Sequence, residues 1–216
     1  MGISMKVTTR PYPIRYYGER ELETEVVCDQ CTLLYSIYGA FAFCPDCGSH
    51  NSFTILTKNL ELADKMLALA AGQGRALAEQ LIGDAMENVV SGFDGFGREL
   101  CRAAAPKATN PPEAEDVRFQ NLKGARTRVQ KLFSIDLTTL VAANDWEFAC
   151  RCFQKRHLLA HKMGVVDDDY LQATNDPAAV VGRKVHIGPD EVKRLCAVMR
   201  QIGESLVARM MPPPNS

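Results

Sequence analysis

Residues 59–105 read NLELADKMLALAAGQGRALAEQLIGDAMENVVSGFDGFGRELCRAAA. This Ala- and Leu-rich stretch has a high helix propensity, and Asn59 can cap its start. Among its glycines, Gly72, Gly74 and Gly83 interrupt the Ala- and Leu-rich part. We therefore expect either two helices or one bent helix here, with a long amphipathic segment from Arg75 to Ala105. A stretch of this kind predicts a mainly α-helical protein.

Further helices are expected toward the C-terminus. A proline-rich segment over residues 106–116 predicts a loop. The periodicity after it predicts helices over residues 119–133, 144–163 and 189–210. Asn144 and Glu147 have the spacing of a capping box at the start of the second of these helices. Pro189 suits the first turn of the last helix, because proline is tolerated where no intrahelical N–H bond is needed.

The first 58 residues have a different character, because Tyr and Thr are frequent and short apolar runs favour strands. So short a segment cannot bury enough surface to fold alone without a cross-link such as a disulfide or a bound metal ion. We therefore expect three parts. They are a small β module over residues 1–58, a helical domain over residues 59–211 and a tail over residues 212–216.

Two C-x-x-C pairs lie in the N-terminal module, Cys28 with Cys31 and Cys44 with Cys47. Each C-x-x-C turn places two thiolates on one side of a loop, and two such turns complete the tetrahedral sulfur shell that zinc favours. A closed shell leaves no position for water, so the pattern predicts one structural zinc ion per chain, with His50 as a bystander. The spacing alone leaves an iron site or a pair of disulfides open. The arrangement resembles a zinc ribbon.

Composition limits the classes of function. The 216 residues carry a formal net charge of −1, so nucleic acid could be attracted only by local basic patches. The chain contains no run of eighteen apolar residues, and its N-terminus is too polar for a secretory signal, so we expect no membrane association. The four remaining cysteines are scattered in helical sequence, which is typical of an intracellular protein. We expect a cytoplasmic location.

The N-terminal module is not basic. Residues 1–58 contain five Lys or Arg against six Asp or Glu, before the thiolates are counted. The predicted zinc ribbon is therefore not a phosphate clamp. We expect it to dock a protein partner at least as readily as it binds RNA.

A charged group falls on the apolar side of the helix predicted over residues 144–163. Its apolar stripe is formed by Ala149, Cys152, Phe153, Leu159, Ala160 and Met163. Arg156, His157 and His161 stand at or beside positions that this helix should bury. A buried guanidinium is costly unless it is paired or meets an anion, so these three residues indicate a site. The alternative is an arginine paired with a carboxylate beside two hydrogen-bonded core histidines.

The two histidines are four residues apart, a spacing that also permits metal binding on one helix face. The zincin pattern, however, requires a glutamate directly after the first histidine, and Leu158 stands there. No catalytic metal is therefore expected.

Arg156, four intervening residues and His161 resemble the R-x4-6-H motif of HEPN-domain ribonucleases. His157 fits the polar residue that often follows the arginine in that family, and the Gly-Val-Val-Asp segment over residues 164–167 extends the likeness. The resemblance covers about residues 60–210 and implies an all-helical bundle of four to five helices. The helix order expected here matches that bundle.

The resemblance implies metal-independent cleavage of RNA, in which the 2′-hydroxyl attacks the adjacent phosphate and leaves a 2′,3′-cyclic phosphate. His161 would act as general acid or base, and Arg156 would hold the phosphate and stabilise its developing charge. His157 would orient this pair or contact the phosphate. The family also implies a homodimer in which two motifs line one cleft, and a role as a toxin or defence effector. For a toxin, the protein partner of the zinc ribbon would be an antitoxin.

Two basic stretches support an anionic ligand. Residues 117–135 contain five basic residues and no acidic one, and residues 147–163 contain four against one. If both helices flank one cleft, they would attract a phosphate backbone. The expected RNA contacts are Arg126, Arg128, Lys131, Lys155 and Lys162. The first stretch can equally be an ordinary solvated helix face.

Two other classes of function remain open. One is a non-catalytic adaptor whose zinc ribbon and helical bundle bind RNA or a protein partner. The other is a transcription-associated module, since zinc ribbons are common there, although the lack of basic charge in the ribbon argues against tight DNA contact.

Overall fold

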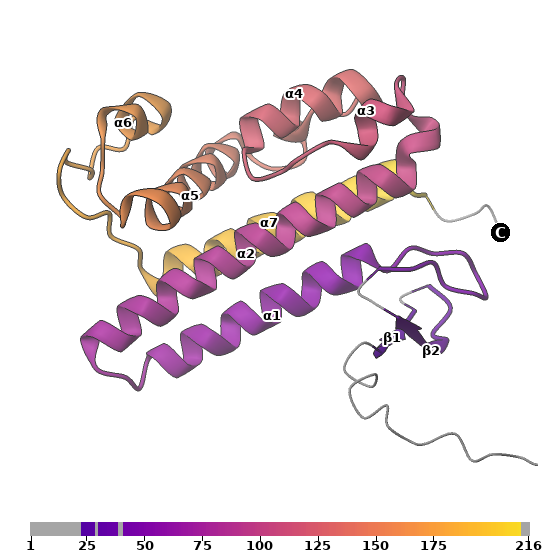
Figure 1. The fold of residues 1–216 in the computed structure, drawn as a ribbon, viewed down its shortest axis with the longest axis horizontal. Coiled ribbons are helices and arrows are strands. Elements are labelled where there is room, and N and C mark those ends of the chain that lie inside the picture. The colour runs from indigo at the N-terminus through magenta and orange to yellow at the C-terminus, as the bar shows by residue number, and fades with distance from the viewer. Residues whose placement is uncertain (1–22, 29, 39–40, 213–216) are drawn as a thin grey trace, which may run out of the picture.

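The structure is a computed structural model that describes residues 23–28, 30–38 and 41–212. Over these residues the protein is mainly helical and has a small two-stranded sheet near its N-terminus, as the sequence predicts (Figure 1). Most of the predicted tail and the first 22 residues of the predicted module lie outside the described residues.

Three long helices form a layer that runs the length of the molecule (Figure 1). They are α1 (Ser52–Ala70), α2 (Arg75–Ala104) and α7 (Pro189–Met210). A short turn around Gly72 separates α1 from α2, so the two-helix reading of this stretch is confirmed. The start of α7 at Pro189 and its end are also as predicted, because the proline ring is compatible with the first helical turn.

The start of α1 was predicted wrongly. The helix begins at Ser52, not Asn59, so the predicted module boundary at residue 58 falls inside it. Leu56 and Leu60 are both fully buried in the main core, and this burial extends the helix by about two turns on its N-terminal side. The amide of Asn59 donates to the carbonyl oxygen of Ile55 at 2.9 Å and caps nothing.

A second group of helices covers one side of this layer (Figure 1). Its elements are η2 (Ala105–Lys107), α3 (Pro111–Glu115), α4 (Leu122–Phe133), η3 (Leu137–Thr139), α5 (Ala143–Lys162) and α6 (Asp168–Thr174). The predicted loop over residues 106–116 therefore contains most of two short helices. Asn110 makes the second of them possible, because its side chain accepts a hydrogen bond from the backbone N–H of Glu113.

Two helix starts differ from the prediction for reasons of capping. α4 begins at Leu122, three residues late, because the side chain of Asn121 accepts from the N–H of Gly124. α5 begins at Ala143 with Ala142 as its N-cap, so the predicted capping box at Asn144 is wrong.

The connection before α4 is fixed to α2 by a close approach. The ring of Phe119 lies directly over Gly97, where a Cβ atom would come within 2.4 Å of the ring carbon Cδ2. One turn earlier on α2, the buried carboxylate of Asp94 accepts a hydrogen bond from the N–H of Phe119 at 2.6 Å. These contacts hold the second group of helices against the central layer.

The N-terminal module consists of β1 (Glu23–Val27) and β2 (Leu34–Tyr38), which pair antiparallel with Val27 opposite Leu34. An isolated bridge between Phe43 and His50 follows β2, and α1 starts directly after it. The module is therefore joined to the central layer without a linker.

Candidate functional site

The four cysteines of the two C-x-x-C pairs come together in the N-terminal module. Their sulfur atoms all lie within 4.8 Å of one another. The distance from Cys28 Sγ to Cys47 Sγ is 3.4 Å, and that from Cys31 Sγ to Cys44 Sγ is 3.6 Å. Four thiolates around a tetrahedral zinc ion would lie roughly 3.8 Å apart, given Zn–S distances of ~2.3 Å. The cluster therefore forms a possible metal site, as the sequence predicts.

The two halves of this site share one backbone pattern. Thr32 N–H donates to the carbonyl of Cys28 and Gly48 N–H to that of Cys44, both at 2.9 Å. Thr32 and Gly48 each take a left-handed conformation, with φ of 62° and 70°. Glycine adopts this conformation at little cost, whereas a β-branched threonine does not. The closed shape of each half thus depends on one backbone position directly after the second cysteine.

Arg156 on α5 is held by a carboxylate from α2. Its Nε and Nη2 atoms donate to Glu87 Oε2 and Oε1, each at 2.6 Å, and the arginine side chain is only 12% exposed. Ser91 Oγ donates to Glu87 Oε1 at 3.0 Å. Partial burial acts to raise the pKa of Glu87, but the hydrogen bonds from Arg156 and Ser91 outweigh it and hold that pKa below its usual range. The pair fixes the plane of the guanidinium group.

His157 and His161 follow Arg156 along α5 and point to solvent. Both rings are exposed, and their centroids are 4.7 Å apart with an interplanar angle of 54°. The expectation that the helix buries them is wrong. In the last turns of α5 the buried positions are Lys155 and Leu158, with Leu158 packed against Val166, so the apolar stripe is rotated away from the histidines.

The end of α5 is fixed by the chain that follows it. Met163 has a φ of 51° and Gly164 a φ of 77°, and Gly164 N–H donates to the carbonyl of Leu158 at 2.9 Å. The next residues pair with a later segment, where Val185 N–H donates to Gly164 O at 2.8 Å. Gly164 therefore ends the helix as predicted, and its backbone anchors the turn next to His161.

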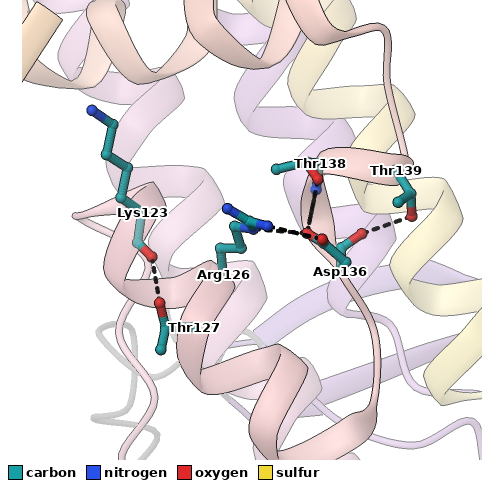
Figure 2. Close-up of polar contacts among 6 residues, drawn as sticks. All are labelled: Lys123, Arg126, Thr127, Asp136, Thr138 and Thr139. Carbon is teal, nitrogen blue, oxygen red and sulfur yellow. Dashed lines mark hydrogen bonds and ion pairs between the residues drawn. The ribbon is translucent and has the colours of Figure 1, made fainter.

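The predicted RNA contacts on α4 are engaged within the chain. Arg126 donates to both carboxylate oxygens of Asp136, at 2.8 and 3.0 Å (Figure 2). Arg128 donates to the carbonyl of Asp116, and Lys131 pairs with Glu113 at 2.8 Å. These side chains order the connections around α4, and Arg126 and Lys131 remain partly exposed within their pairs.

The two predicted contacts on α5 are also paired. Lys155 is 9% exposed, and its Nζ atom donates to Glu191 Oε1 at 2.7 Å and to the carbonyl of His186 at 3.0 Å. This burial contradicts its predicted role as a phosphate contact. Lys162 forms an ion pair with Asp167, just after the end of the helix. Each of the five predicted basic residues therefore has a partner within the chain.

Glu87 is the site residue that the sequence did not indicate. It lies 69 residues before its partner Arg156, and nothing in the local pattern of α2 distinguishes it from the other acidic residues of that helix. The one usable signal was Arg156 itself, because an arginine at a covered helix position requires an acceptor.

No family model matches the chain, and no curated protein or solved structure matches it either. Among the described helices, none combines the length and the apolar character needed to cross a membrane.

Proposed function

We propose that the protein is a metal-independent endoribonuclease of the HEPN type, with Arg156 and His161 as its catalytic residues. The observation that carries this proposal is the end of α5, where a guanidinium fixed by Glu87 and two solvent-exposed imidazole rings lie within the last two turns of one helix. Phosphoryl transfer from RNA requires these two functions, a fixed cation and a proton-transferring group.

The Arg156–Glu87 pair supports the proposal through its geometry. Glu87 engages Nε and Nη2 and leaves the two Nη1 protons outside the pair. Those protons can donate to a non-bridging phosphate oxygen without rotation of the side chain. A guanidinium group that is already oriented loses less conformational entropy on binding than a free one.

The proposed reaction needs no water in its first step. An imidazole takes the proton of the 2′-hydroxyl, the 2′-oxygen bonds to phosphorus, and the bond from phosphorus to the 5′-oxygen breaks. The leaving 5′-oxygen receives a proton from an imidazolium. His161 serves as acid or base, and His157 orients it or contacts the phosphate. Two copies of the chain, with their motifs facing one cleft, would supply both protonation states at once.

The test compares RNA cleavage by wild-type protein and by His161→Ala, in buffer with EDTA and with the zinc content of each preparation measured. His186→Ala is a matched control, because His186 is also an exposed histidine near the end of α5. We expect wild type and control to produce 2′,3′-cyclic phosphate ends. The rate for His161→Ala should be about 10²- to 10⁴-fold lower. Equal cleavage by wild type and His161→Ala, or no cleavage of any RNA by wild type, would count against the proposal.

One observation favours a second candidate, a non-catalytic adaptor. Glu87 already balances the charge of Arg156 within a single chain, and the basic residues of α4 and α5 named above have their own acceptors. An adaptor would contact its partner through the N-terminal module, whose four cysteines we propose hold a structural zinc ion. Cleavage by wild type in the test above separates the two candidates.

A further inference from the structure

A groove of about 320 Å³ lies where the N-terminal module meets α2. The module contributes three aromatic rings, from Phe41, Phe43 and His50, and α2 contributes Glu99 and Arg102. Its volume is at the lower end of the range for small-ligand sites, ~300–1,000 Å³. The proposed catalytic residues do not line it.

The rings of the groove contact one another through His50. The His50 ring is parallel to that of Phe41, with 6.3 Å between centroids and an interplanar angle of 5°. It meets Phe43 edge to face, with centroids 4.9 Å apart. Phe43 is 52% exposed, so a large part of its ring faces solvent. The groove therefore presents open aromatic surface.

The metal-binding loop holds these rings in place. Phe43 and His50 are bridged across the turn that contains Cys44 and Cys47. Inside that bridge, Cys44 N–H donates to the carbonyl of Ser49 at 2.7 Å. The rings can keep their relative positions only while this turn is closed. The site is thus preorganised by the same loop that would bind zinc.

The charge at the groove favours an anionic ligand. Arg102 and Glu99 form an ion pair at 2.6 Å, and their side chains are 47% and 19% exposed. The guanidinium is therefore the more exposed group of the pair. Its remaining N–H groups are the ones at this groove that could donate to a phosphate.

We propose that this groove binds a nucleotide of single-stranded RNA, with the base stacked on the exposed ring of Phe43 and the adjacent phosphate contacted by Arg102. The proposal rests on the proposed function in taking RNA as the ligand. Bases of any sequence present a π-face, so such a site would bind RNA without strong sequence preference. Because its charge comes from one arginine, the logarithm of affinity should fall with the logarithm of salt concentration with a slope of about −0.7.

The groove lies apart from the Arg156 site. Glu87 and Glu99 are separated by twelve residues of α2, roughly 18 Å along the helix axis at 1.5 Å per residue. A nucleotide bound in the groove would therefore not be the one that is cleaved. Loss of the groove should raise KM and leave kcat unchanged.

The experiment measures binding of a labelled single-stranded RNA of about 12 nucleotides, within the site sizes of single-strand binders. All proteins carry His161→Ala so that the RNA stays intact. Phe43→Leu keeps an apolar side chain and removes the π-face, and Arg102→Gln removes the charge. Leu34→Ala is the control for Phe43→Leu, because Leu34 is also an exposed apolar residue of the module. Arg75→Gln is the control for Arg102, because Arg75 also belongs to an exposed ion pair on α2.

We expect binding to be about 5- to 100-fold weaker for Phe43→Leu and weaker for Arg102→Gln, with both controls and the zinc content unchanged. Equal binding by Phe43→Leu and its control would overturn the inference and leave the ribonuclease proposal intact. Absence of RNA binding, or binding of a peptide in its place, would also overturn it. Groove-dependent RNA binding by a protein that never cleaves RNA would support the inference and reject the ribonuclease proposal.

Discussion

Arg156 of α5 and Glu87 of α2 form a two-pronged ion pair, with both N–O distances at 2.6 Å. The pair joins the central layer to the second group of helices through α5, the helix that also carries the two exposed histidines. Arg156 thus has a structural role whether or not it also binds a phosphate. The two roles can be separated by changing its partner.

Replacing Glu87 by alanine should affect both stability and cleavage. The change leaves a largely covered guanidinium without an acceptor, so we expect the free energy of unfolding to fall by about 1–3 kcal/mol. Glu87→Gln keeps one acceptor and should cost less. If Glu87 orients Arg156 for phosphate, kcat should fall for both variants, and more for alanine. Chemical denaturation and initial cleavage rates measure the two effects.

The control for this prediction is Glu79→Gln, which removes the partner of Arg75 in an exposed pair on the same helix. It should change neither quantity, because exposed pairs of this kind contribute little. A Glu87→Ala protein as stable as wild type would show that Arg156 does not depend on this carboxylate.

Gly95 and Gly97 lie two residues apart on α2, and replacing each by alanine should change the stability of the protein in opposite directions. At Gly97 the new Cβ would overlap the Phe119 ring, whereas at Gly95 there is nothing within 4 Å. We expect Gly97→Ala to lower the free energy of unfolding by about 1–3 kcal/mol through overpacking. Gly95→Ala should raise it by up to about 1 kcal/mol through helix propensity. Urea denaturation of the two variants provides the comparison, and a stabilising effect at Gly97 would contradict the close approach.

The two halves of the cysteine site should also differ under substitution. Thr32→Gly relieves a β-branched residue with positive φ and should stabilise the site, while Gly48→Ala introduces strain at the equivalent position. We expect Thr32→Gly to retain zinc longer than wild type against a competing chelator, and Gly48→Ala to lose it sooner. Equal rates of zinc loss from wild type, Thr32→Gly and Gly48→Ala would argue against the shared backbone pattern.

Asp136 should make stability depend on acidity. Hydrogen bonds from Arg126 and from Thr138 hold the pKa of Asp136 well below its usual range (Figure 2). A carboxyl group with a lowered pKa stabilises the fold above its unfolded-state pKa of about 3.9, and this contribution is lost as the pH falls toward the folded-state pKa. Asp136→Asn should therefore lower Tm at pH 6, and the difference from wild type should shrink as the pH falls below about 4.

The comparison for Asp136 is Asp190→Asn, which changes an almost fully exposed carboxylate. Its Tm difference from wild type should be small at every pH. A constant Tm difference for Asp136→Asn across the acid range would show that its hydrogen bonds to Arg126 and Thr138 do not involve the ionised form.

Local chemistry explains which parts of the fold could be predicted. Pro189 marks the start of α7 and the glycines around residue 72 mark the turn after α1, because both residue types act on the backbone where they stand. The four cysteines define their site for a similar reason, since their spacing fixes which thiolates can meet. Ser52 gave no such signal, because the early start of α1 depends on the burial of Leu56 in a core made by distant helices.

The same distinction between local signals and contacts made by distant helices applies to the candidate site. The motif residues Arg156 and His161 could be found because they lie on one helix within two turns. Glu87 could not, because pairing between α2 and α5 depends on how the helices pack. The burial of Lys155 was missed for the same reason, since its partner Glu191 belongs to α7.

The continuity of α2 from Arg75 to Ala104 gives the molecule a fixed internal spacing. Glu87 and Arg102 belong to one unbroken helix, so the distance between the aromatic groove and the paired arginine cannot change unless the helix bends. A single RNA strand that occupied both places would have to match that spacing. The length of α2 between the two places would then set how many nucleotides separate the anchored nucleotide from the bond that is cleaved.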